Sequence, residues 1–178
     1  MASLLKLADM ASTQPSGQGE IVIRPATVRD APEIARIVNS YAECGKMLPR
    51  PLAAIYQFLR EFVVAELDEQ VVGCAALSIF WGDVGEVRSL AVSHTYRGRG
   101  IGGKLVRRVL QDAHELGIPR VFALTYEVAF FDKLGFQRIQ RDELPRKIWR
   151  DCINCVKFAE CDETALIIET ASIEESTL

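Results

Sequence analysis

The sequence lacks any apolar run long enough to cross a membrane, because none approaches the roughly 18 residues that a transmembrane helix needs. It also lacks a strong excess of charge. The formal net charge of −3 gives no electrostatic reason to expect a nucleic acid or an anionic membrane as a partner. No long apolar segment follows the weakly amphipathic residues 1–11, so we expect no signal peptide.

Histidine is scarce, and the number of cysteines is odd. The five cysteines are Cys44, Cys74, Cys152, Cys155 and Cys161. An odd set of this kind is more typical of reduced thiols than of a disulfide scaffold, so we predict a cytoplasmic protein. The last three cysteines contain a Cys-x2-Cys spacing, which is a common half of a zinc site. The two histidines lie far from them in sequence, and Cys44, Cys74 or a neighbouring aspartate would have to supply the fourth ligand. We therefore favour free thiols and expect no bound metal.

The chain has an ordinary globular composition, with 178 residues, 49% of them hydrophobic and 25% charged. A polar stretch over residues 12–19 predicts a flexible N-terminal tail over 1–19. We expect a single domain over 20–170, which includes the cysteine-containing segment 151–162, and a C-terminal tail over 171–178.

The apolar periodicity predicts an order of elements. We expect strands at 21–24, 62–67, 71–80, 86–92, 120–124, 136–139 and 165–169, and helices after Asp30 and over 52–59, 101–116, 127–134 and 144–150. Antiparallel strands come first and a strand–helix–strand unit follows. This order indicates an α/β (α+β) fold with a mixed, mostly antiparallel sheet flanked by helices.

The most informative segment is a glycine-rich turn, Arg97-Gly98-Arg99-Gly100-Ile101-Gly102-Gly103. It follows an apolar strand and opens a long helical pattern, an arrangement in which backbone N–H groups and the helix dipole together favour an anion. Arginines in the turn add donors for phosphate oxygens. The spacing is not that of a nucleoside-triphosphate loop, and no alternating strand–helix units surround it as in a dinucleotide-binding fold. We predict a ligand that carries phosphates.

The fuller string from Ala91 to Gly102 resembles the acetyl-CoA-binding motif of the GNAT acyltransferase superfamily. The resemblance implies acetyl-CoA as co-substrate, with its pyrophosphate on the amides of the turn. It implies a splayed parallel pair of strands, 86–92 and 120–124, with pantetheine in the gap. The residues implied to bind the co-substrate are Leu90, Ala91, Val92, Arg97, Gly98, Arg99, Gly100, Ile101, Gly102 and Gly103.

Acetyl transfer to an amine also needs a base and an acid. Our candidate base is Glu86, which by period two is expected to share a face with Arg88, Leu90 and Val92; a solvated carboxylate at a strand end is the alternative. In the family a tyrosine protonates the departing thiolate, but Phe131 stands at that position here. Tyr126 or solvent is therefore the candidate acid that protonates the departing thiolate. The neighbouring phenylalanines are expected to pack the core.

The strings Gly85–Val92, Leu124–Glu127 and Glu143–Pro145 resemble the acetyltransferase domain of N-acetylglutamate synthases. That branch implies direct acetylation of the α-amino group of L-glutamate in a ternary complex, the first step of arginine biosynthesis. No kinase-like region precedes the module, so we expect a stand-alone short form. Because glutamate has two carboxylates, its binding site is expected to contain two or more cationic side chains. The predicted substrate-binding residues are Leu48, Arg50, Arg88 and Lys157.

Two other hypotheses remain open. The acceptor could be another amine, such as a protein N-terminus, although the basic segment around Arg50 disfavours polyamines and aminoglycosides. Alternatively, the chain could be a coenzyme A or amino-acid sensor in which the cysteine segment reports redox or metal state. Phe131 favours that second hypothesis slightly, whereas Glu86 and the intact glycine turn disfavour it. The sequence leaves a homodimer and feedback by arginine undecided.

Overall fold

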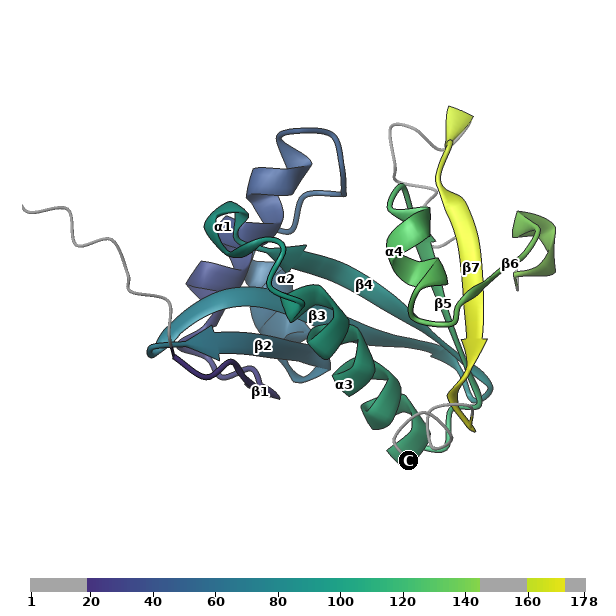
Figure 1. Ribbon diagram of the computed structural model, residues 1–178, viewed down its shortest axis with the longest axis horizontal. Coiled ribbons are helices and arrows are strands. Elements are labelled where there is room, and N and C mark those ends of the chain that lie inside the picture. Colours follow the sequence, from purple (N-terminus) through teal and green to yellow (C-terminus); the bar gives the residue numbers. More distant parts are fainter. Residues whose placement is uncertain (1–18, 145–159, 172–178) are drawn as a thin grey trace, which may run out of the picture.

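The computed structural model describes residues 19–144 and 160–171, and the strands of these residues form one sheet in the order β1-β2-β3-β4-β5-β7-β6 (Figure 1). The strands are β1 (Val22–Pro25), β2 (Phe62–Leu67), β3 (Gln70–Trp81), β4 (Val84–Val92), β5 (Arg120–Thr125), β6 (Gln137–Arg138) and β7 (Thr164–Glu169). The helices are α1 (Ala31–Ala42), α2 (Leu52–Gln57), α3 (Ile101–Glu115) and α4 (Val128–Asp132). Short 3-10 turns span Leu59–Glu61, His94–Tyr96 and Arg141–Glu143.

This architecture confirms the predicted fold class. Neighbouring strands pair antiparallel, with the exception of β4 and β5, which run parallel. Three predicted elements are at least two residues shorter than expected: the strand over 136–139 contains only Gln137 and Arg138, the helix over 127–134 contains only Val128–Asp132, and the helix over 52–59 ends at Gln57. The helix expected over 144–150, most of both tails and the start of the cysteine-containing segment lie outside the described residues.

Each face of the sheet is covered by helices (Figure 1). Helix α3 buries a stripe on one face, because its apolar residues recur three and four positions apart. The buried members are Ile101, Leu105, Val106, Val109, Leu110 and Ala113. Helix α1 buries Ile34, Ile37, Val38 and Tyr41 against the other face. No helix in the described part of the chain combines the length and the apolar character of a membrane span.

Strands β4 and β5 separate soon after they meet. They pair only from Val84 opposite Arg120 to Glu86 opposite Phe122. Figure 1 shows the two strands close together at the lower right and diverging towards the top. Since the strands no longer bond to each other beyond Glu86, a gap opens between the second half of β4 and the end of β5. The predicted splayed pair is therefore present.

A β-bulge at Ser89 changes which side chains of β4 share a face. Ser89 has a φ of 52°, and the register with β3 shifts between Cys74 and Ala76. Two residues of β4 thus oppose one residue of β3, which reverses the alternation. Val87 and Leu90 both contact the core under α3, whereas Arg88 lies opposite Ala76, which belongs to the core under α1. The expectation that Glu86 and Arg88 share a face with Leu90 and Val92 is wrong.

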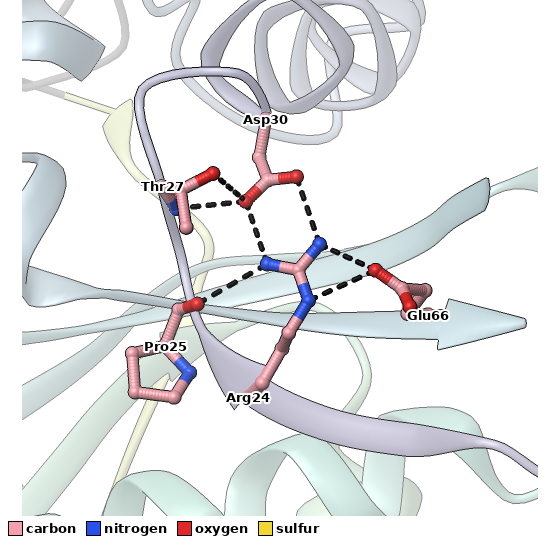
Figure 2. A network of polar contacts seen from close by, with 5 residues as sticks. All are labelled: Arg24, Pro25, Thr27, Asp30 and Glu66. Carbon is pink, nitrogen blue, oxygen red and sulfur yellow. Dashed lines mark hydrogen bonds and ion pairs between the residues drawn. The ribbon is translucent and has the colours of Figure 1, made fainter. Parts of the chain in front are cut away.

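A cluster of charged side chains joins β1, β2 and the start of α1 (Figure 2). The Arg24 guanidinium donates to both carboxylate oxygens of Asp30, at 2.7 and 3.0 Å, and its Nε donates to Glu66 at 2.9 Å. Asp30 also accepts from the backbone N–H and the hydroxyl of Thr27. The pKa of Asp30 is lowered from 3.8 to about 2, and the hydrogen bonds from Arg24 are the largest cause. These contacts fasten the first helix to the sheet.

Candidate functional site

A cleft of about 490 Å³ opens where β4 and β5 separate. Its walls come from β4, the glycine-rich turn, the end of β5, α4 and the loop between α1 and α2. The predicted residues that line it are Leu48, Arg50, Glu86, Arg88, Leu90, Ala91, Val92, Arg97, Gly98, Gly100, Ile101, Gly102, Gly103 and Tyr126. Segments from four separate parts of the chain therefore meet in one cavity. Arg99 is not among the lining residues, and Lys157 lies outside the described residues.

The glycine-rich turn needs glycine for its backbone conformation. Gly98 and Gly100 have φ angles of 78° and 74°, which side chains disfavour, and Gly100 is the N-cap of α3. A Cβ added at either position would meet no heavy atom within 4 Å, so the turn has an open surface. A Cβ at Gly102 would lie 3.3 Å from the Phe130 ring. The turn and the N-terminus of α3 thus form a site that a large anion can approach closely.

Tyr41 connects α1 to the strand and the turn. Its hydroxyl donates to the carbonyl of Val92, and its ring stacks on His94 with centroids 4.7 Å apart. The Arg97 guanidinium lies 5.3 Å from the same ring centroid. Burial raises the pKa of the Tyr41 phenol. The sequence assigned Tyr41 only to the buried face of a helix; nothing local indicated that it would also line the cleft.

Glu86 and Arg88 lie side by side on β4, both largely buried. Their side chains are 15% and 13% exposed, and Arg88 Nε is 4.0 Å from Glu86 Oε2. Arg88 Nη1 donates to the hydroxyl of Ser78 at 3.2 Å. Ser78 lies directly opposite Glu86 on β3 and is only 4% exposed. Sequence reasoning missed Ser78, because a single serine within an apolar strand gives no functional signal.

The main chain of Arg50 is held by the side-chain amide of Asn39. The Asn39 amide donates to the Arg50 carbonyl at 3.0 Å, and its oxygen accepts from the Arg50 N–H at 2.9 Å. Asn39 belongs to α1, so this pair of bonds anchors the loop that carries Leu48 and Arg50 to a buried helix. The loop thereby brings Arg50 to the cleft that also contains Glu86 and Arg88.

Tyr126 and Phe131 have different environments. Tyr126 lines the cleft with 38% of its surface exposed. Phe131 is 4% exposed and makes edge-to-face contacts with Phe130 and Phe136, with centroids 5.1 and 5.0 Å apart. The phenylalanines therefore pack the core as expected.

The cleft is also lined by three charged residues that the sequence analysis did not single out: Lys46, Glu127 and Glu163. Lys46 lies 3.7 Å from Glu127, which pairs the α1–α2 loop with the start of α4. These residues are distant in sequence from the glycine-rich turn, and only the folded chain brings them to the same cavity. The cleft consequently contains charges of both signs.

The cysteines are only partly described. Cys152 and Cys155 lie outside the described residues, so the proposed zinc-type spacing stays untested. Cys74 is fully buried in the core, and that burial raises the pKa of its thiol to about 12. Within 19–144 and 160–171, no group of three histidine, cysteine or acidic side chains is arranged to hold a metal ion.

Comparison with known proteins decides the family. The model of the acetyltransferase (GNAT) family matches residues 32–136. An uncharacterised N-acetyltransferase of Chlorobaculum tepidum is 41% identical over 82% of this chain and 94% of its own length. The chain belongs to the GNAT acetyltransferase family. Its sheet, with the separated parallel strands and the glycine-rich turn, is thus a GNAT fold, as the sequence predicted.

Two other similar proteins have names that specify the acceptor of the acetyl group. The amino-acid acetyltransferase of Mycobacterium tuberculosis is 44% identical over 67% of this chain and 70% of its own length. The N-acetylglutamate synthase of Neisseria gonorrhoeae, solved with coenzyme A and N-acetyl-glutamate, superposes with a TM-score of 0.77 at 31% identity. That match covers 86% of this chain but only 36% of the synthase chain, so the resemblance concerns about a third of the larger protein.

Proposed function

We propose that this GNAT enzyme transfers the acetyl group of acetyl-CoA to the α-amino group of a free amino acid, L-glutamate being the preferred acceptor. The single observation that supports this most is the composition of the cleft. One cavity contains the phosphate-type turn, a carboxylate at Glu86 and two arginines, Arg50 and Arg88. The similarity to an amino-acid acetyltransferase and to an N-acetylglutamate synthase supports the same substrate class.

The donor half of the cleft fits coenzyme A. The open surface at Gly98 and Gly100 leaves room for a pyrophosphate against the backbone, and Arg97 adds a cation beside it. The gap between β4 and β5 is where a thin pantetheine arm would enter. The bulge removes the main chain around Ser89 and Leu90 from the regular ladder with β3, and both residues line the cleft. A backbone N–H there would polarise the thioester carbonyl.

The acceptor half supplies the remaining chemistry. An incoming ammonium must lose a proton before its nitrogen can attack the thioester carbon, and Glu86 is the carboxylate placed to receive that proton, directly or through a water. As the new C–N bond forms, the C–S bond breaks, the nitrogen releases a second proton to solvent and the thiolate takes up a proton. Tyr126 has a hydroxyl at the cleft and is our candidate donor, with solvent as the alternative. Arg50 and Arg88 would bind the two carboxylates of glutamate.

A turnover assay tests the proposal directly. Purified protein is incubated with acetyl-CoA and a panel of free amino acids and peptides with free N-termini, and the released thiol is measured. We expect the highest kcat/KM with L-glutamate. Turnover of a peptide but of no free amino acid would leave the fold and the donor correct and would overturn the acceptor. A protein that binds acetyl-CoA without any turnover would support the sensor hypothesis instead.

The donor site has a separate test. Gly100→Asp places a side chain and a negative charge where the backbone must approach phosphate, at a position whose φ of 74° already disfavours a side chain. We expect coenzyme A binding to weaken by more than about tenfold, measured by calorimetry. Gly45→Asp is a matched control, since Gly45 has a similar φ of 68° and equally open surroundings outside the cleft. Equal affinity in both folded variants would exclude this turn as the pyrophosphate site.

A further inference from the structure

The pair Glu86–Arg88 has the charge arrangement that complements an α-amino acid. A free amino acid carries an ammonium and a carboxylate on the same carbon. Glu86 and Arg88 offer the opposite charges on one face of β4, with Nε and Oε2 4.0 Å apart, and both line the cleft. The largely buried position of both side chains limits screening by solvent.

Ser78 fixes the orientation of that arginine. A guanidinium is planar, and its five N–H donors point in set directions. The Arg88 Nη1 donates to Ser78 Oγ at 3.2 Å while Nε faces Glu86, so two edges of the plane are located by neighbours. Ser78 is itself 4% exposed on the interior strand β3, which gives its hydroxyl a rigid support. A guanidinium held in this way loses less conformational freedom when a carboxylate binds.

We propose that Glu86 and Arg88 bind the zwitterionic head group of a free α-amino acid, and that Ser78 is the positioning residue that aligns Arg88 with the α-carboxylate. The proposal rests on the function proposed above and refines it. Arg50, on the separate α1–α2 loop, is then the partner of the side-chain carboxylate. A peptide N-terminus has an uncharged amide in place of the α-carboxylate, so it would leave the largely buried Arg88 without that partner.

Three acceptors separate the two carboxylates: L-glutamate has both, L-glutamine keeps only the α-carboxylate, and the α-amide of glutamic acid keeps only the side-chain carboxylate. We expect Ser78→Ala to lower kcat/KM about tenfold for glutamate and glutamine and to leave kcat/KM for the α-amide unchanged. The variant loses the hydrogen bond to Arg88 whichever acceptor is present, but the loss affects only acceptors whose α-carboxylate Arg88 binds. Arg50→Ala should give the complementary pattern, with losses for glutamate and the α-amide but not for glutamine.

Two variants control for structural effects. Ser78→Thr keeps a hydroxyl and should recover most of the loss. Ser40→Ala removes a hydroxyl that bonds only to the Ile37 carbonyl within α1, outside the cleft, and should change no ratio. The KM for acetyl-CoA should stay constant in all Ser78 variants.

The outcomes distinguish the two proposals. Equal losses on all three acceptors in Ser78→Ala, or wild-type turnover of the α-amide as fast as glutamate, would overturn the role given to Ser78 and Arg88 while the proposed function stands. Absence of turnover with every free amino acid in the wild-type protein would overturn the proposed function, and this assignment with it.

Discussion

Two clusters in this protein combine arginine with carboxylates, but their geometry differs. In one, Arg24 bonds to Asp30 and Glu66 at hydrogen-bond distance, with a bidentate pair to Asp30 (Figure 2). In the other, Arg88 lies 4.0 Å from Glu86, which is too long for a direct hydrogen bond between those atoms. Arg24 and Asp30 line a separate hollow of about 660 Å³, whereas Glu86 and Arg88 line the cleft of about 490 Å³ beside the glycine-rich turn.

This difference corresponds to the roles that we propose for the two clusters: a structural role for the first and substrate binding for the second. The guanidinium of Arg24 links β1 to the start of α1 and to the more distant strand β2, so its bonds stabilise the fold. The Arg88 guanidinium contacts Ser78 and Glu86 at the wall of the cleft, where we propose that it binds substrate. We therefore expect changes in the first cluster to lower stability, and changes in the second cluster to lower activity.

The largest effect is expected from Glu86→Gln, which keeps the shape of the side chain and removes its basicity. We expect kcat to fall about 100-fold or more, with partial recovery at higher pH as the substrate amine loses its proton unaided. Thermal unfolding should change little. Steady-state kinetics as a function of pH provide the measurement. Full kcat in this variant would exclude Glu86 as the base.

Arg50→Ala should act on the acceptor alone. Loss of one charge-assisted pair in a partly dry cleft costs about 2–4 kcal/mol, which corresponds to an increase of roughly 30-fold or more in the KM for glutamate. The KM for acetyl-CoA should remain almost the same. A similar rise in both KM values would show that the Asn39-anchored loop positions the whole cleft rather than one carboxylate.

Asp30→Asn should break the structural cluster without affecting the cleft. The variant keeps the size of the side chain but removes the charge that Arg24 contacts, and we expect a loss of about 2 kcal/mol in the free energy of unfolding. Chemical denaturation measures the loss, and kcat/KM of the folded variant should match the wild type. Glu33→Gln is the matched control, because its pair with Arg36 is on the surface and should contribute less than about 0.5 kcal/mol.

The same cluster predicts an acid sensitivity. The pKa of Asp30 is lowered from 3.8 to about 2 in the folded protein, so its contribution to stability is complete above about pH 4 and declines as the pH falls towards 2. By pH 3 the wild type should have lost about 1 kcal/mol from this group. The unfolding free energies of wild type and Asp30→Asn should therefore converge in this range. Parallel curves would contradict the assignment.

The sequence by itself determined most of the elements and the glycine-rich turn that we propose as the donor site. The apolar spacing of α3 and the bounds of β2 follow from short-range patterns, and the structure has both as predicted. Gly98 and Gly100 have a positive φ that few other residues adopt, so the turn can be predicted from the local sequence without knowledge of the rest of the chain. Local conformational preference and periodicity are properties of neighbouring residues, which is why a single sequence reveals them.

Only the tertiary structure decided which residues meet at the proposed acceptor site. The bulge at Ser89 reversed the predicted face of half a strand, and β7 entered the sheet between β5 and β6. The contact between Arg88 and Ser78, like the approach of Arg50 to β4, depends on the register and packing of segments far apart in sequence. Register and packing are set by which surfaces bury one another across the whole sheet, and no local pattern contains that information.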